Sequence, residues 1–381
     1  MKILFVDSSP TMLKKLHLPI AKLIGDKSKC LFLSTGLSSN VDANAEAKSL
    51  DEIMNYGKFI NANAFFNADS FLASNDIRYA CFSGFRIFDA YWINKCKKYS
   101  ISTVMFQHGL EIDHVFYKPT ELIKKVYKIL AFILLQIKIS ANTKSNFFEN
   151  FSSYIAYIAF GAKPKSTVMN LELCHPDIFF TYSEWYINFW KKKFGFCKTK
   201  FVISRACDLE HIDMLEKASL KKNTVCYICQ TLVEDGRMAK DAYSKLIKGI
   251  IESIPEHMEL VFKLHPRSNH NLYEQFHIKL ENEMPNTAVY ITHYSSIALP
   301  VYLHSGNLIF YEIDGHPIPE IFKFMSKYKV NNTYYLKRMI KSLTFANGEK
   351  SNKDLRYTNC ENFLSTKSKN YPEQIFELFS N

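Results

Sequence analysis

The sequence repeats one pattern that strongly restricts the fold: a short, mostly apolar segment followed at once by polar residues. KILFV (2–6), RYACF (78–82) and STVMF (102–106) follow this pattern, and a helix-like stretch from Phe85 to Lys98 separates the last two. Apolar segments of this length are typical of strands that are buried on both faces of a parallel sheet. The order strand, helix, strand predicts a βαβ unit and therefore an α/β lobe.

The pattern occurs again at DIFFT (177–181), before an aromatic, lysine-rich helix that we expect to end near Phe194. It restarts after Gly195, where helices are expected near 238–253 and 270–283. The apolar segments of this second series are TVCYICQ, MELVFKL, AVYIT and NLIFYEI. They predict a second doubly wound lobe.

A chain of 381 residues is long enough for two domains, and a hydrophobic fraction of 47% supplies core material for both. We therefore expect an α/β protein with two Rossmann-like lobes, residues 1–190 and 191–381, that face each other across a cleft. Ligands bind such sheets at the carboxyl ends of the strands. The polar loops that follow the apolar segments are the first places to look for a site.

The net charge of +11 fits a nucleic acid, a phosphorylated small molecule or an anionic membrane surface as a partner. The lysines are dispersed over most of the chain, whereas a nucleic-acid binder concentrates them on one helix or stripe. We therefore expect no nucleic acid partner. The nine cysteines form no CxxC pair, and the first residues read as a strand and not as a signal peptide, so we expect reduced thiols and a cytoplasmic location.

One segment, KKVYKILAFILLQIKIS (124–140), does not fit the alternation of strands and helices. Its apolar centre is too short to span a bilayer, which needs about 20 residues. A lysine-flanked amphipathic helix is expected, and it has two possible positions. It packs on the first lobe, or it lies on an anionic membrane surface and makes the protein peripheral at the inner face of the cytoplasmic membrane.

In the second lobe, the loop after TVCYICQ contains two adjacent acids and a glycine, Glu234, Asp235 and Gly236. Two close carboxyl groups push their pKa values apart, so one of them is a candidate general base. The alternative is that the acid pair caps a helix that starts at Arg237.

The segment VFKLHPRSN (261–269) ends a strand with Lys263, His265 and Arg267. Pro266 favours an extended backbone at the histidine and so keeps it at the edge of the sheet. The three basic side chains predict a cradle for a phosphate group.

The loop after AVYIT contains Ser295 and Ser296 before a helix-like stretch. Two hydroxyls at such a turn can donate to a phosphate together with the first amides of the helix. Alternatively, a serine here is only the helix N-cap. The three loops are one strand–helix repeat apart, so we expect them to emerge at the same edge of one sheet and to converge on one ligand.

This ordered set, an acidic pair with glycine, then His-Pro, then Ser-Ser, resembles the motifs of bacterial sialyltransferases with the GT-B fold. That group includes the lipooligosaccharide sialyltransferases and the polysialyltransferases. The resemblance implies that Glu234 is the general base, that His265 assists the departing nucleotide, and that the two serines hold its phosphate. The motif begins with Glu where many relatives have Asp, which the family pattern permits.

The implied enzyme is an inverting sialyltransferase that moves sialic acid, or a related nonulosonic acid, from a CMP-activated donor to a glycan or glycolipid hydroxyl. The acceptor would be a cell-surface glycan, namely lipooligosaccharide, O-antigen or capsule. Negative charge grows on the leaving CMP, so Lys263 and Arg267 are expected to support His265 at the phosphate. No DxD-like metal motif lies in a suitable loop, so we expect no metal and no cofactor; the CMP-sugar is a substrate.

The first lobe contributes the loops Ser83–Gly84 and His108–Gly109, for which a role at the acceptor or at the donor phosphate is one interpretation and a structural role is the other. The His-Gly pair also resembles that of polyol-phosphate polymer transferases, which have the GT-B fold and a CDP-linked donor. Such a transferase is the first alternative function. A noncatalytic sugar-nucleotide-binding protein of the same fold is the second.

Overall fold

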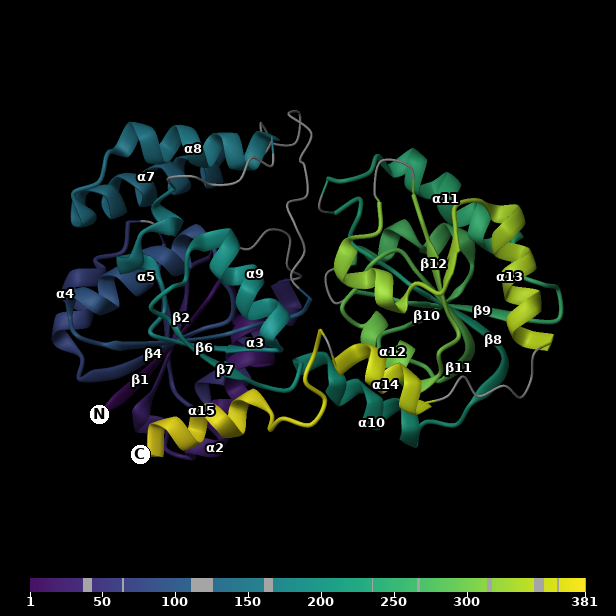
Figure 1. Ribbon diagram of the computed structural model, residues 1–381, viewed down its shortest axis with the longest axis horizontal. Coiled ribbons are helices and arrows are strands. Elements are labelled where there is room, and N and C mark those ends of the chain that lie inside the picture. The colour runs from purple at the N-terminus through teal and green to yellow at the C-terminus, as the bar shows by residue number, and fades with distance from the viewer. Residues whose placement is uncertain are drawn as a thin grey trace. The chain divides into compact units, whose positions relative to one another are not determined.

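The computed structural model describes residues 1–36, 43–63, 65–110, 126–160, 167–234, 236–265, 268–313, 317–345, 353–361 and 363–380. The chain forms two compact units, each built around its own parallel sheet (Figure 1). The first unit consists of Met1–His108, His114–Ala206 and Phe363–Asn381. The second consists of Gly109–Asp113 and Cys207–Asn362.

The first unit contains a seven-stranded sheet with the order β3-β2-β1-β4-β5-β6-β7, and all neighbouring strands are parallel. Its strands are β1 (Lys2–Asp7), β2 (Cys30–Ser34), β3 (Lys58–Asn61), β4 (Ile77–Phe82), β5 (Ser102–Phe106), β6 (Ile178–Thr181) and β7 (Lys200–Ile203). The apolar segments that predict strands at 2–6, 78–82, 102–106 and 177–181 coincide with β1, β4, β5 and β6. Their inner positions are buried, as the pattern predicts.

Helices cover both sides of this sheet and complete the doubly wound architecture (Figure 1). Helix α9 starts where the Ser183 hydroxyl accepts a hydrogen bond from the Tyr186 amide, and it ends at Gly195 with φ 77°, close to the predicted end. The helices of the unit are α1 (Pro10–Met12), α2 (Leu18–Ile24), α3 (Ala43–Met54), α4 (Ala68–Ser74), α5 (Ile87–Lys98), α7 (Val126–Thr143), α8 (Phe147–Phe160), α9 (Glu184–Phe194) and α15 (Tyr371–Ser380).

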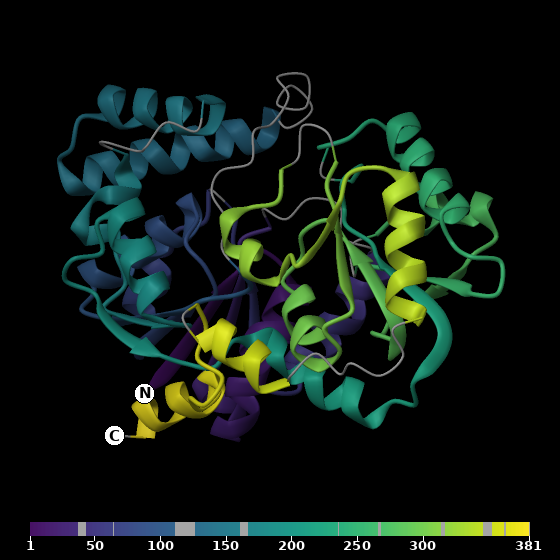
Figure 2. The ribbon, with the colours of Figure 1, turned by 45° about the vertical axis from the view of Figure 1, so that its right-hand side comes forward.

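Helices α7 and α8 form a hairpin on the outside of the first unit, and both views show them together above α5 (Figures 1 and 2). Helix α7 contacts α5 on one side and α8 on another. Its residues Ala131, Leu135 and Ile139 are buried. The prediction that the segment 124–140 packs on the first lobe is therefore confirmed for one side of this helix.

The second unit contains a six-stranded parallel sheet with the order β10-β9-β8-β11-β12-β13. Its strands are β8 (Lys221–Ile228), β9 (Glu259–Lys263), β10 (Lys279–Glu281), β11 (Thr287–Thr292), β12 (Leu308–Tyr311) and β13 (Tyr328–Val330). Its helices are α10 (Glu210–Lys217), α11 (Lys240–Glu252), α12 (Ala298–His304), α13 (Thr333–Phe345) and α14 (Lys353–Glu361). Two parallel, doubly wound sheets confirm the predicted fold class.

The prediction of a helix near 270–283 is wrong. The structure has two short 3-10 turns, His270–Leu272 and Glu274–Phe276, followed by the edge strand β10. The chain turns out of the helical region at His277, whose φ is 52°, and β10 then pairs with β9. Pairing at the edge of the sheet therefore overrides the weak helical pattern of this segment.

The units divide the chain at Ala206, later than residue 190, because β7 pairs with β6 and so belongs to the first sheet. The last residues also return to the first unit. There, α15 contacts α2, and the Tyr371 hydroxyl donates to the Leu16 carbonyl at 2.7 Å.

Candidate active site

The three loops that the sequence singles out in the second lobe follow β8, β9 and β11, which are neighbours in the sheet. Tyr227 of β8 is in register with Phe262 of β9 on one side and with Ile291 of β11 on the other. Because all three strands are parallel, their carboxyl ends lie at one edge. The direction of the strand order reverses between β8 and β11, which is where open α/β sheets bind ligands.

The Glu234 carboxylate is held through one of its two oxygens only. Its Oε1 accepts a hydrogen bond from the Asn269 amide at 2.8 Å. Its Oε2 is buried and has no hydrogen-bond partner in the part of the chain that the structure describes. A buried carboxylate oxygen without a donor is costly unless a ligand supplies one.

Glu234 does not cap a helix, so that alternative is wrong for this residue. Helix α11 begins at Lys240, and its N-cap, Ala239, makes no side-chain hydrogen bond. Gly236 has φ 71°, a conformation that favours glycine, and its amide donates to the Val233 carbonyl at 3.0 Å. The neighbouring Asp235 lies outside the described residues.

His265 lies two residues after the end of β9 and begins a tight turn. Its amide donates to the Ser268 hydroxyl at 3.1 Å, and its carbonyl accepts from the Ser268 amide at 2.8 Å. Lys263 is buried, and its ammonium donates to the Leu264 carbonyl at 2.5 Å. Arg267 lies outside the described residues.

Ser295 and Ser296 form the turn before α12 but do not cap it with their side chains. The N-cap of α12 is Ile297, without a side-chain hydrogen bond. The serine carbonyls accept from the amides of Ala298 and Leu299 at 2.9 and 3.1 Å. Neither serine hydroxyl makes a hydrogen bond within the described ranges, so both are free to donate to a ligand. The amides of Ala298 and Leu299, in contrast, are already used.

His293, which directly follows β11, stabilises this loop through two hydrogen bonds, a role that we did not predict from the sequence. It is buried, and its Nδ1 lies 2.8 Å from the Tyr311 carbonyl, which can only accept. Nδ1 therefore carries the proton, and Nε2 accepts from the Tyr227 hydroxyl at 2.7 Å. The signal for this residue is a histidine directly at the end of an apolar strand.

Two further contacts join the loops. Arg237 Nη1 donates to the Tyr294 hydroxyl at 3.4 Å, which links the loop after β8 to the loop after β11. Gly109 is grouped with the second unit, and its φ of 71° favours glycine. A Cβ placed on Gly109 would lie 3.7 Å from the Ser296 hydroxyl oxygen. The backbone at Gly109 therefore passes close to Ser296.

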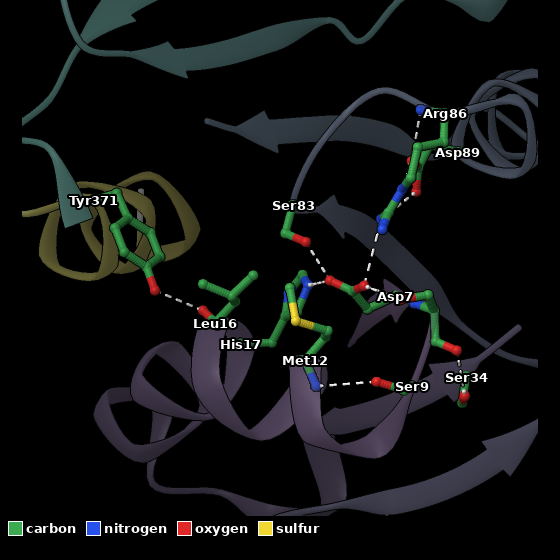
Figure 3. Close-up of polar contacts among 11 residues, drawn as sticks. Asp7, Ser9, Met12, Leu16, His17, Ser34, Ser83, Arg86, Asp89 and Tyr371 are labelled. Atoms are coloured by element: carbon green, nitrogen blue, oxygen red, sulfur yellow. Dashed lines mark hydrogen bonds and ion pairs between the residues drawn. The ribbon is translucent and has the colours of Figure 1, made fainter. Parts of the chain in front are cut away.

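The first unit has its own polar cluster at the carboxyl ends of β1 and β4, where its strand order reverses (Figure 3). Asp7 at the end of β1 is fully buried and accepts from the Ser8 amide at 2.6 Å. His17 Nε2 lies 3.3 Å from its carboxylate, and the hydroxyl of Ser83, after β4, also donates to it. Arg86 Nη2 completes the set at 3.4 Å.

Arg86 is shared with a second buried acid, Asp89, in the first turn of α5 (Figure 3). The amide and Nε of Arg86 each donate to Asp89 at 2.8 Å. Burial would raise the pKa of Asp7, but Arg86 and the hydrogen bonds of His17 and Ser83 hold that pKa well below its usual range. Burial dominates at Asp89 and raises its pKa to about 6 despite Arg86.

Of this cluster, the sequence singles out only Ser83, together with Gly84. Asp7, His17, Arg86 and Asp89 were not predicted. The detectable signal is an acid directly after a buried strand at Asp7; the partners come from other turns of the chain and share no local motif.

Together, two doubly wound parallel sheets and polar loops at the carboxyl ends of adjacent strands define a protein of the GT-B type. Solved structures agree in fold. UDP-GlcNAc 2-epimerase from Methanocaldococcus jannaschii superimposes with a TM-score of 0.53 at 13% identity, over 100% of this chain and 99% of that one. The Neisseria meningitidis UDP-GlcNAc 2-epimerase gives 0.52 at 9% identity over 100% of both chains, and LpCGTa in complex with UDP gives 0.50 at 10% identity over 100% of this chain and 98% of that one.

The family is defined by sequence. Residues 48–298 match the model of the alpha-2,8-polysialyltransferase (POLYST) family, and the chain belongs to this family. It is therefore an enzyme, a glycosyltransferase of the sialyltransferase class. No curated protein sequence gives a significant match to the chain. None of the helices in the described part of the chain is long and apolar enough to cross a membrane.

Proposed function

We propose that the protein is an inverting, metal-independent sialyltransferase. It moves sialic acid, or a related nonulosonic acid, from a CMP-linked donor to a hydroxyl of a cell-surface glycan such as lipooligosaccharide, O-antigen or capsule. Family membership supports the donor class and the reaction type. The observation that carries the catalytic assignment is the Glu234 carboxylate, which is fixed through Oε1 by the loop of His265 and has a buried, unpartnered Oε2.

In this proposal Glu234 is the general base. Its Oε2 accepts the proton of the acceptor hydroxyl as the oxygen attacks the anomeric carbon. The bond from that carbon to the CMP phosphate breaks on the opposite side, so the configuration inverts. Asp235 and Gly236 support the base, the first by its charge and the second by the turn that it permits.

The departing phosphate gathers negative charge, and donors placed around it lower the barrier. We assign this role to His265, Ser295 and Ser296, with positive charge from Lys263 and Arg267. The two serine hydroxyls in the turn after β11, the strand next to β8, support the assignment, because one hydrogen bond to an ionised group contributes about 1.5–3 kcal/mol. These side chains supply the charge that a divalent ion would otherwise provide, so we propose that none is required.

We further propose that the second unit binds the CMP-sugar and that the first unit binds the acceptor, with His108 and Gly109 as supporting residues. The enzyme would work in the cytoplasm, at the inner face of the membrane on which the glycan is assembled. The polar cluster around Arg86, at the switch point of the first sheet, supports a binding role for that unit.

A donor panel tests the proposal. CMP-sialic acid, CDP-glycerol and UDP-sugars are compared by thermal shift and by release of free nucleotide, with and without EDTA. We expect stabilisation and nucleotide release with CMP-sialic acid alone, unchanged by EDTA. Preference for CDP-glycerol would favour a polyol-phosphate polymer transferase. Stabilisation by CMP-sialic acid without turnover in the presence of any glycan acceptor would favour a noncatalytic binding protein.

A further inference from the structure

The α7–α8 hairpin of the first unit exposes an apolar surface. Four of its large apolar side chains are strongly exposed: Leu130 by 59%, Ile137 by 46%, Phe148 by 79% and Ile155 by 43%. Leu134 and Phe151 lie between them and are half-buried. We call these six residues the hairpin face. Contiguous exposed apolar residues on a folded protein mark an interaction site.

The residues of the hairpin face lie on one side of each helix. A spacing of three or four residues places side chains on one stripe of a helix. This spacing separates Leu130, Leu134 and Ile137 on α7. It also separates Phe148, Phe151 and Ile155 on α8. On α7 this stripe is turned away from Ala131, Leu135 and Ile139, which are buried on the α5 side.

The two stripes also fall on the same side of the hairpin. The helices are antiparallel neighbours, since Asn150 donates to the Ser140 hydroxyl at 3.4 Å and the rings of Phe132 and Tyr154 are 6.5 Å apart. These contact positions are on average about a third of a turn from the stripe on each helix, and in opposite rotational senses when both helices are viewed from one end. The stripes of α7 and α8 therefore form one continuous surface opposite α5.

The charge of this part of the chain favours one kind of partner. Residues 124–165 contain seven lysines and one glutamate in the sequence. Of the lysines whose side chains the structure describes, Lys144 is exposed in the turn between the two helices, whereas Lys138 lies over the Tyr91 ring of α5. A second copy of the chain would bring like charges together, whereas an anionic bilayer offers both an apolar interior and negative headgroups.

We propose that the hairpin face docks on the surface of an anionic lipid bilayer. The apolar side chains of α7 and α8 enter the boundary between headgroups and acyl chains, and exposed lysines such as Lys144 contact lipid phosphates. The helices lie along the surface and do not cross it. This inference does not depend on the proposed catalytic roles, because lipid binding can be measured without turnover.

Cosedimentation with vesicles tests the docking. Vesicles of phosphatidylcholine alone are compared with vesicles in which phosphatidylglycerol replaces part of it, at low and high salt. The full-length protein should bind the anionic vesicles and be released by salt, which screens the headgroups. The double variant Ile137→Ser/Phe148→Ser should bind about tenfold or more weakly, because each side chain loses its burial in the bilayer.

Leu220→Ser/Leu355→Ser is the matched control, because those leucines are exposed by 52% and 57% in the second unit. The control should bind vesicles as the wild type does, and both variants should keep the wild-type unfolding temperature. Equal vesicle binding by the wild type and Ile137→Ser/Phe148→Ser would overturn the proposal. So would a concentration-dependent dimer that only this variant loses in the absence of lipid, since the hairpin face would then bind a second copy.

Discussion

The Asn269 amide donates to Oε1 of Glu234 at 2.8 Å, and this contact joins the loops after β8 and β9. It fixes the carboxylate through one oxygen and leaves Oε2 buried without a partner in the described part of the chain. A base must keep one lone pair for its substrate while the rest of its side chain is held in place. The contact therefore supports Glu234 as the residue that meets the acceptor hydroxyl.

Glu234→Gln should reduce transfer by about 100-fold or more while CMP binds nearly as before, because a glutamine cannot take the proton and the base does not touch the nucleotide. The amide oxygen of glutamine can still accept from Asn269, so the loop should keep its shape. Glu256→Gln, an exposed acid before β9, is the control and should retain full activity. Activity retained in Glu234→Gln but lost in Asp235→Asn would move the base by one residue.

His265→Ala should lower turnover and weaken CMP binding together, because the imidazole is assigned to the phosphate that leaves with the nucleotide. His257→Ala is a control at the opposite end of β9 and should change neither quantity. Titration of CMP and steady-state rates give the two numbers. Wild-type affinity and wild-type rate in His265→Ala would show that the phosphate assignment is wrong.

Ser296→Ala should weaken CMP binding by roughly tenfold to a hundredfold, the effect of one hydrogen bond to an ionised phosphate. Ser295→Ala should behave similarly, because neither hydroxyl is used as a helix cap. Ser305→Ala, at the other end of α12, serves as the control, because the hydroxyl that it removes contacts only the backbone of Val301 and Asn307 in the described part of the chain. Equilibrium titration of CMP decides the point, and unchanged affinity in both turn variants would remove the serines from the site.

The buried acids of the first unit predict a pH dependence of stability. The pKa of Asp89 is raised to about 6 from the ordinary value of 3.8 for an aspartate. Between these values the folded state binds a proton that the unfolded state lacks, so the free energy of unfolding falls as pH rises from about 4 to 6. Asp89→Asn should remove up to about 3 kcal/mol of this fall.

Asp7→Asn is the matched comparison, because the pKa of Asp7 is lowered and that carboxylate stays ionised throughout this range. This variant should be destabilised between pH 5 and 7, since the stability from Asp7 is lost only below the unfolded pKa of about 4. It should keep most of the fall, because burial is the main cause of the raised pKa of Asp89 and only the smaller repulsion from Asp7 is removed. Urea unfolding across the range measures both effects. A wild-type pH slope in Asp89→Asn would contradict the assignment.

Much of the architecture could be predicted because buried parallel strands are apolar along their length. KILFV and STVMF identify β1 and β5 without further information. The apolar segments also placed Glu234, His265 and Ser296 after β8, β9 and β11, which are neighbouring strands, although two short turns and β10 replace the helix expected between β9 and β11. Regular local patterns were sufficient for these features.

Contacts between distant segments could not be predicted in the same way. Asn269 holds Glu234 through its backbone amide. Every residue except proline has such an amide, so the residue type at position 269 does not predict this contact. Asp7 and Arg86 are brought together only by the pairing of β1 with β4. The edge strand β10 was missed because its sheet partner, and not its own sequence, determines its conformation.

Product analysis with CMP-sialic acid and a sialylated glycan acceptor tests the central claim most directly. Mass spectrometry counts the residues added to the acceptor, and NMR gives the anomeric configuration, with EDTA present and with Glu234→Gln in parallel. We predict that the wild type adds sialic acid with a configuration opposite to that of the donor, and that the variant adds almost none. Transfer with retention of configuration, or no transfer from CMP-sialic acid but transfer of glycerol phosphate from CDP-glycerol, would contradict the account.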